Sequence, residues 1–190
     1  MKYDMGMGYQ EQTGWIGAND GFLVLDRLGL RGDPVAGAGP TGLVLMAGAL
    51  ATLLAQWGLI PILHLGPRAS CLWGMVLAAL GVSVLSVAGE LHTITMGIAL
   101  ASLGFGLFRP GFTAGASLAV SRAEQGQAAG IVASVNGAAY IVAPAIGVWL
   151  YGHNPWIGFG AIELLCLAVV ILGLKGMVAD EDLTEPRARI

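Results

Sequence analysis

Residues 102–151 read SLGFGLFRPGFTAGASLAVSRAEQGQAAGIVASVNGAAYIVAPAIGVWLY, and they carry the clearest structural signal in the chain. Its charges are confined to Arg109 and to the short segment SRAEQG at 121–126. On either side of that segment the chain is apolar and rich in glycine and alanine. Both apolar runs are long enough for a helix to cross the hydrocarbon core, which takes about 20 residues. The stretch therefore predicts two membrane-spanning helices joined by a short polar loop.

The composition of the whole chain agrees with a membrane protein. Of its 190 residues, 56% are hydrophobic and 11% are charged, whereas soluble domains carry about 25% charged residues. So few polar groups cannot cover a soluble surface, and the surplus apolar surface must face lipid. The net charge of −3 gives no support for nucleic acid or any other polyanionic partner.

Charged residues mark where further helices end on both sides of residues 102–151. The fold class we expect is an all-α polytopic membrane protein with about five transmembrane helices and a partial sixth at the N-terminus. The five spans are expected near residues 38–60, 69–88, 94–118, 128–150 and 156–175. The last two are separated by the turn sequence Tyr151-Gly-His-Asn-Pro155. The loops are short and leave no room for a separate soluble domain.

The two ends of the chain differ from this bundle. Residues 1–21 are polar, and acidic residues interrupt them, so we do not expect this segment to span the membrane. Residues 22–30 look like the end of a helix without its beginning. The bundle is therefore expected over residues 22–177, followed by a polar cytoplasmic tail at 178–190.

The orientation follows from the lysine and arginine residues near the helix ends. Five spans place Arg68, Arg122, Lys175, Arg187 and Arg189 on one side and Arg27 and Arg31 on the other. Because cytoplasmic loops carry the excess of basic residues, we expect the C-terminus to be cytoplasmic.

Several segments together resemble the second half of a major facilitator superfamily transporter, in the drug:proton antiporter group that includes tetracycline-efflux proteins. LDRLGL at 25–30 looks like the end of that family's seventh helix, and ALATLLAQWGLIP at 49–61 resembles its eighth. Residues 102–151 are the most specific part, since they resemble the tenth helix, a loop with an EQG motif and the eleventh helix. The GP-type motif of that helix begins here with Ala143 in place of glycine. The resemblance covers residues 22–175.

This resemblance implies half of a fold that is built from two six-helix bundles. It implies small-molecule efflux by proton antiport in a bacterial inner (plasma) membrane, with no enzymatic activity and no cofactor. The partners implied are the lipid bilayer, a small-molecule substrate, and an N-terminal half or a second copy of the chain. The alternative is a non-transporting membrane subunit or a remnant fragment that acts through helix packing with a partner.

Arg109 is the first candidate for a substrate-pathway residue. A buried arginine keeps its charge and costs roughly 3 kcal/mol or more at the centre of a membrane helix, so it needs a partner or a water-filled cavity. One reading is an anion- or carboxylate-facing site on the pathway. The other is snorkelling, or a hydrogen bond to a helix carbonyl such as the one that Pro110 leaves without a donor.

Glu163 lies near the middle of the last predicted span. A carboxyl group there could take up and release protons, which makes Glu163 a proton-coupling candidate. The alternatives are an ion pair with Arg109 and a protonated acid that faces other helices.

Three uncharged polar residues complete the pathway candidates. Asn136 and Tyr140 are four residues apart and share one helical face, which could border a cavity or clamp two helices together. Gln56 ends the first clear span and is favoured as an interfacial residue over a substrate-binding one.

Small residues and proline predict helix packing and gating positions. Two pairs have GxxxG spacing, which favours close helix contact. The prolyl residue of the Ala143–Pro144 motif should bend its helix. The residues concerned are Gly111, Gly115, Gly126, Gly130, Pro144 and Gly147.

The sequence offers little for metal or redox chemistry. Cys71 and Cys166 lie in different apolar segments without a CxxC partner, so both are expected to be buried small apolar residues. The three histidines lack HxxxH or HExxH spacing, and we expect no metal site.

Overall fold

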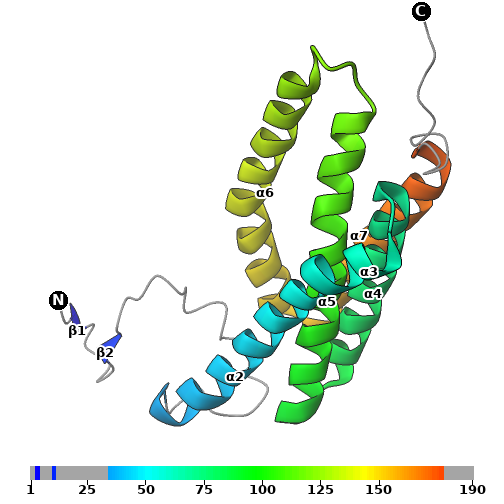
Figure 1. Cartoon of the computed structure of the whole chain (residues 1–190). Helices are drawn as coiled ribbons and strands as arrows, with labels where there is room; N and C mark the ends of the chain where they lie inside the picture. The colour runs from blue at the N-terminus through cyan, green and yellow to red at the C-terminus, as the bar shows by residue number, and fades with distance from the viewer. Residues whose placement is uncertain (1–2, 5–9, 12–33, 178–190) are drawn as a thin grey trace, which may run out of the picture.

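The computed structural model describes residues 3–4, 10–11 and 34–177, and the last of these ranges is almost wholly helical (Figure 1). The helices are α2 (Pro34–Leu53), the π-helix η1 (Leu54–Leu59), α3 (Ile60–Leu63), α4 (Pro67–Val87), α5 (Leu91–Leu118), α6 (Gln125–His153) and α7 (Pro155–Gly176). Two short strands, β1 (Tyr3–Asp4) and β2 (Gln10–Glu11), form an antiparallel pair.

The expected all-α membrane architecture is confirmed. α2, η1 and α3 follow one another as one continuous rod, and this rod and the four other long helices are each long and apolar enough to cross a membrane. The helices extend a few residues past the predicted spans at most of their ends, and α4 includes the charged Arg68 in its first turn. The predicted helix remnant at 22–30 and the tail at 178–190 lie outside the described residues, as does most of segment 1–21.

The corner between α6 and α7 is tighter than the sequence indicated. α6 runs to His153, and α7 begins at Pro155, where a missing N–H costs nothing in the first helical turn. Between them, the Asn154 side chain accepts a hydrogen bond from the Trp156 N–H at 2.9 Å. One residue thus reverses the chain and caps the next helix.

α4 and α5 approach each other closely through glycines. A Cβ atom built on Gly74 would lie 2.7 Å from the Gly104 carbonyl oxygen, and one on Gly81 would lie 2.7 Å from the Ala101 Cα. A real Cβ atom does not fit at such distances. Glycine is therefore required where the two backbones touch, as is common where membrane helices pack.

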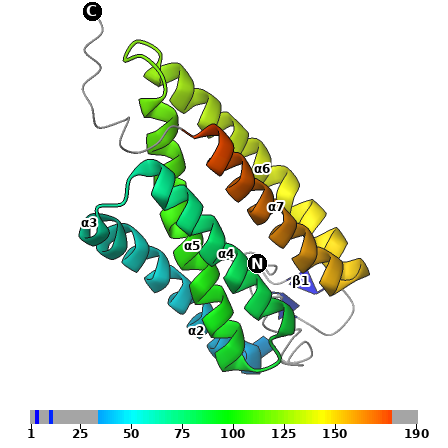
Figure 2. The same ribbon diagram turned by 90° about the vertical axis from the view of Figure 1, so that its right-hand side faces the viewer.

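The helices are arranged around α4 and α5. α5 packs against both α4 and α2, while α4 also packs against α7 (Figure 2). The largest buried cluster joins α2, α4, α5 and α7 and comprises Val44, Val82, Leu85, Ala88, Ile94 and Phe159. α6 runs beside α7, and none of its residues is buried among the described part of the chain.

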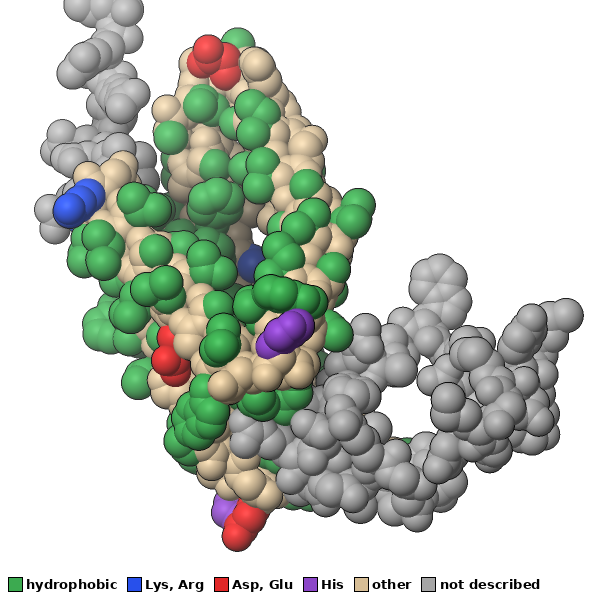
Figure 3. Space-filling model, turned by 180° about the vertical axis from the view of Figure 1, so that it is seen from behind, with side chains coloured by type: hydrophobic (Ala, Val, Ile, Leu, Met, Phe, Trp, Pro, Cys, Tyr) green, Lys and Arg blue, Asp and Glu red, His purple; other side chains and the backbone are tan. Residues whose placement is uncertain are grey.

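The outer surface is dominated by apolar side chains. On the face in Figure 3 they cover the long helices, and most of the acidic side chains lie near helix ends. A hollow in the middle of this face has a basic side chain at its floor. Apolar cover with sparse charge is the surface that a bilayer requires.

A polar cleft between α2 and α5

The cleft is positioned by a close crossing of α2 and α5. A Cβ atom on Gly48 of α2 would lie 2.9 Å from the Ser102 hydroxyl of α5, and one on Gly106 of α5 would lie 2.9 Å from the Ala55 Cβ. The Thr52 hydroxyl donates to the Gly48 carbonyl at 3.0 Å and also lies 3.3 Å from the Ser102 carbonyl. The two helices are therefore fixed against each other just before the cleft begins.

The next turn of the first helical rod is π-helical. The Ile60 N–H donates to the Ala55 carbonyl, five residues earlier, in place of the usual four. Pro61, which has no N–H to give the Trp57 carbonyl, follows directly. The wider turn changes the direction of the side chains at this point, and such turns recur at functional sites.

A cavity of about 510 Å³ opens where η1 faces α5. We call it the Arg109 cleft, and its lining residues are Gln56, Trp57, Ile60, Arg109, Pro110 and Thr113. Within the described residues, Arg109 supplies the only formal charge on this lining. A cleft of this size can hold one small organic molecule.

Arg109 reaches the cleft because of its place on α5. It follows Gly106 by three residues and precedes Thr113 by four, so the three residues share one face of the helix. It lies nine residues before Leu118, about 14 Å along the helix axis. The guanidinium has no hydrogen-bond or ion-pair partner in the part of the chain that is described, while the Arg109 carbonyl accepts from the Thr113 hydroxyl at 2.9 Å. The structural alternative for Arg109, a hydrogen bond from its side chain to a helix carbonyl, is therefore not observed among the described residues.

Gln56 shares this cleft with Arg109. The sequence favoured an interfacial role for Gln56, and its side chain is indeed exposed, but it faces the same cavity as the arginine. Gln56 and Arg109, two of the five pathway candidates, thus line one cleft although they are 53 positions apart in the sequence.

Glu163 lies elsewhere, at the contact between α4 and α7. Its carboxylate accepts a hydrogen bond of 2.7 Å from the Ser83 hydroxyl of α4. It does not line the Arg109 cleft, and it forms no ion pair with Arg109 among the described residues. The alternative in which Glu163 pairs with Arg109 is therefore not observed among the described residues, where the partner of Glu163 is Ser83.

Asn136 and Tyr140 lie in α6 with exposed side chains, and Tyr140 is 66% exposed. Neither lines the Arg109 cleft. Their predicted role at a cavity or in an interhelical clamp would need a partner from outside the described residues, and it stays a prediction.

The predicted packing positions divide between two helices. Gly111 and Gly115 of α5 face the start of α4, where a Cβ on Gly111 would lie 2.9 Å from the Pro67 carbonyl oxygen. By contrast, nothing among the described residues lies within 4 Å of a Cβ built on Gly126, Gly130 or Gly147 of α6. α6 continues through Pro144 as one helix. The packing and gating roles of these α6 positions remain predictions.

At one end of the bundle, the basic residue Arg68 forms a hydrogen bond with a neighbouring helix. The Arg68 side chain, at the start of α4, donates to the Leu174 carbonyl near the end of α7 at 3.0 Å. This contact places Arg68 and Lys175 at the same end of the bundle, as the charge pattern predicts. The donation also satisfies a carbonyl in the last turn of α7, which lacks a partner within its helix.

The loop between α5 and α6 is folded tightly around Glu124. Its carboxylate accepts from the Ser121 hydroxyl at 2.6 Å and from the Ser121 N–H at 3.3 Å. These hydrogen bonds lower the pKa of Glu124 below its usual value. The Gln125 side chain donates to the Ser117 carbonyl at 3.3 Å and so holds the start of α6 to the end of α5. Glu124 and Gln125 of the EQG motif thus hold the α5–α6 loop in place through local hydrogen bonds.

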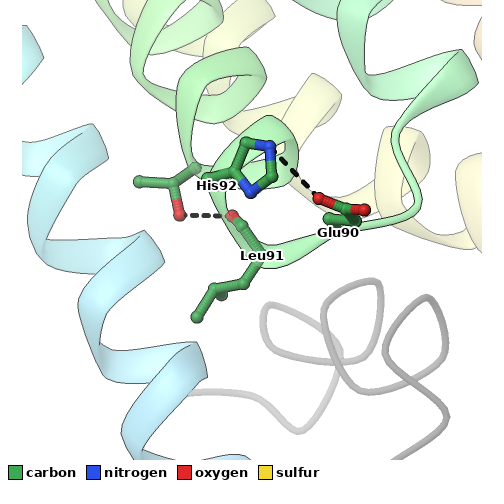
Figure 4. A network of polar contacts seen from close by, with 4 residues as sticks. Glu90, Leu91 and His92 are labelled. Atoms are coloured by element: carbon green, nitrogen blue, oxygen red, sulfur yellow. Dashed lines mark hydrogen bonds and ion pairs between the residues drawn. The ribbon is translucent and has the colours of Figure 1, made fainter.

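A second cavity, of about 590 Å³, lies at the other end of α5 and α2, lined by Leu43, Leu91, His92, Thr95, Met96 and Ala99. Here Glu90 and His92 form an exposed contact of 3.2 Å at the turn before α5 (Figure 4). The lining is mostly apolar and its polar groups are already engaged locally, since the Thr95 hydroxyl donates to the Leu91 carbonyl at 2.7 Å. This cavity is the weaker candidate for a site.

Cysteines and metal-binding groups add nothing to either cavity. Cys71 and Cys166 are both buried, as the sequence led us to expect, and they form no disulfide among the described residues. In the described part of the chain no three His, Cys, Asp or Glu side chains gather closely enough to hold a metal ion.

The bundle of five long apolar helices, with the Arg109 cleft between two of them, is the architecture of a polytopic membrane protein. The family model of the Major Facilitator Superfamily matches residues 23–189. The chain therefore belongs to the Major Facilitator Superfamily. No curated protein and no solved structure matches it. Membership makes it an integral membrane protein of a superfamily that moves small molecules across membranes and is generally non-enzymatic.

Proposed function

We propose that the chain takes part in the transmembrane transport of a small molecule along a pathway bordered by the Arg109 cleft. The observation that carries this proposal is that Gln56 and Arg109, two polar residues from separate membrane helices, line one cavity of about 510 Å³. An unpaired cation inside a membrane helix is expensive, and such residues commonly mark substrate and ion pathways.

The direction and the coupling are part of the same proposal. Resemblance to drug:proton antiporters favours efflux from a bacterial cytoplasm, with the C-terminus on the cytoplasmic side. Glu163 is the candidate for proton coupling, since its carboxyl group lies within a membrane helix and is held by one hydroxyl. Because Glu163 does not line the Arg109 cleft, coupling between the two would act through α4, which contacts both α5 and α7.

We propose further that the chain works as one half of a transporter. In this superfamily the substrate site lies between two bundles. α6, which presents 29 residues without a buried side chain, offers a face for the other bundle. The complement would be a separate N-terminal half or a second copy of this chain. The same face also suits the alternative of a non-transporting subunit that packs against a partner.

Flux in proteoliposomes tests the proposal. The chain is reconstituted alone, and then with a coexpressed N-terminal bundle from the same source, and the movement of fluorescent drug substrates is followed under an imposed proton gradient. We expect flux that the gradient drives, that Arg109→Gln lowers, and that Glu163→Gln abolishes. Gradient-independent flux would contradict antiport. The absence of flux in both preparations, with stable copurification of one unrelated membrane protein, would favour the subunit alternative.

A further inference from the structure

We infer that the Arg109 cleft binds an amphipathic organic anion, whose carboxylate lies on Arg109 and whose planar apolar body lies against Trp57 and Ile60. This inference deepens the proposed transport function and rests on it, because it names the class of substrate for the same cleft.

The charge of the lining selects an anion. Arg109 is the one formal charge among the described residues that line the cleft, and Glu163 lies elsewhere, at the α4–α7 contact. Because an arginine is never deprotonated in a protein, the cleft is positive at every physiological pH. That positive charge attracts anions and repels cations. The planar guanidinium also matches a carboxylate, which it can hold with two parallel hydrogen bonds.

The hydrogen-bonding groups beside Arg109 limit the ligand further. The Thr113 hydroxyl already donates its one hydrogen to the Arg109 carbonyl at 2.9 Å, so it can only accept from a ligand. The Gln56 amide can both donate and accept. The cleft therefore offers a strong donor for the anionic group and a weaker acceptor next to it, which suits a ligand that carries a hydroxyl or N–H as well as an acid.

The rest of the lining is apolar and aromatic. Trp57 is 82% exposed in the chain, and with Ile60 it forms one wall of the cleft. An indole ring supplies a broad flat surface on which an aromatic ligand can stack. The cavity of about 510 Å³ has room for one molecule of two or three fused rings.

Binding to the full chain in phosphatidylcholine nanodiscs tests the inference with three probes of one shape. These are 2-naphthoate, the neutral 2-naphthamide and the cationic 2-naphthylmethylammonium, and their affinities are measured by calorimetry. We expect 2-naphthoate to bind at least about tenfold more tightly than either of the others, the ratio that one charge-assisted hydrogen bond supports. Arg109→Gln should remove that preference, whereas the matched loop variant Arg122→Gln should keep it.

Gln56→Glu supplies a second, independent test in case Arg109→Gln does not fold. A new carboxylate beside Arg109 should pair with it and lower the affinity for 2-naphthoate at least about tenfold while favouring the cation. Equal affinities for the three probes, or an unchanged preference in folded Arg109→Gln, would overturn the inference. An anionic lipid is the other source of the same chemistry. If phosphatidylglycerol copurifies with the chain and displaces 2-naphthoate at equal concentration, the occupant is a lipid and the inference fails.

The outcome is separable from that of the proposed function. Selective 2-naphthoate binding without flux in either reconstitution would support the ligand class and contradict transport. Flux of a neutral substrate that Arg109→Gln leaves unchanged would support transport and contradict the ligand class.

Discussion

The contact between α4 and α5 predicts opposite effects for the same substitution at two glycines. Gly104→Ala places a Cβ atom 2.5 Å from the Gly74 carbonyl oxygen and 2.9 Å from the Ala78 Cα, both backbone atoms of α4. The first distance is 0.9 Å short of the 3.4 Å at which ordinary van der Waals contact begins, so α4 and α5 must move apart. At Gly137 of α6 nothing in the described chain lies within 4 Å, so the same substitution meets no obstacle.

The difference in the free energy of unfolding between these two variants measures the cost of placing a methyl group in the α4–α5 contact. Both substitutions gain roughly 1 kcal/mol of helix propensity, which cancels in the comparison. Forcing one methyl group into a packed contact costs about 1–3 kcal/mol. We therefore expect the free energy of unfolding of Gly104→Ala to be about 1–3 kcal/mol lower than that of Gly137→Ala.

Unfolding of the purified chain in mixed dodecylphosphocholine and SDS micelles, followed by circular dichroism, measures this difference. Gly137→Ala should be at least as stable as the unsubstituted chain. Equal unfolding midpoints for the two variants would refute the close α4–α5 contact, because a Cβ atom would then fit where the geometry leaves no room.

Two further predictions concern single polar contacts. Glu163→Gln should change the free energy of unfolding by less than about 0.5 kcal/mol, because an amide can still form a hydrogen bond with Ser83. Glu163→Leu should lower it by about 1 kcal/mol, the usual contribution of an interhelical hydrogen bond in membranes. The same micelle titration measures both variants, and an equal loss in the two would contradict the Ser83 contact. The pKa of Glu124 is lowered in the folded chain, so its stabilisation of the α5–α6 loop is present above the ordinary glutamate pKa of about 4.3. That stabilisation is lost as the pH falls through the lower pKa of the folded state. Hydrogen exchange at the start of α6 should accelerate over that acidic range in the unsubstituted chain and show no such step in Glu124→Gln.

The helices could be predicted from the sequence because their signal is strong and local. Uncharged runs of spanning length define them, and the lipid environment leaves a helix as the one way to satisfy the backbone. The ends were less certain, since caps such as Asn154 depend on a single side-chain contact.

The cleft could be predicted only in part. Arg109 is conspicuous, because a charge in an apolar run needs an explanation. That Gln56 joins it depends on the π-helical turn at Leu54–Leu59, which redirects the side chains and has no clear mark in the sequence apart from Pro61. Trp57 was missed for the same reason, whereas Thr113 lies in α5 and is a single threonine in an apolar helix, which carries no distinctive mark.

The glycine contacts illustrate a second limit. The GxxxG spacing of Gly111 and Gly115 stands out in the sequence, but the closest approaches between α4 and α5 are made by Gly81 of α4 and Gly104 of α5. Each of these glycines lies three residues from an alanine rather than four from a glycine. A count of alanines together with glycines at that spacing, as in Gly97–Ala101–Gly104, would have found this face.

Cysteine accessibility within the membrane tests whether the Arg109 cleft belongs to a water-filled transport pathway. Gln56→Cys and Thr113→Cys are made in a background with Cys71→Ala and Cys166→Ala, and Leu164→Cys on the outer face of α7 serves as the lipid-facing control. A charged, membrane-impermeant methanethiosulfonate is then applied to membranes that contain the chain. We expect rapid modification at positions 56 and 113, slowed by 2-naphthoate, and almost none at position 164. Equally slow modification at all three positions would show that the cleft faces lipid and would contradict a pathway along it.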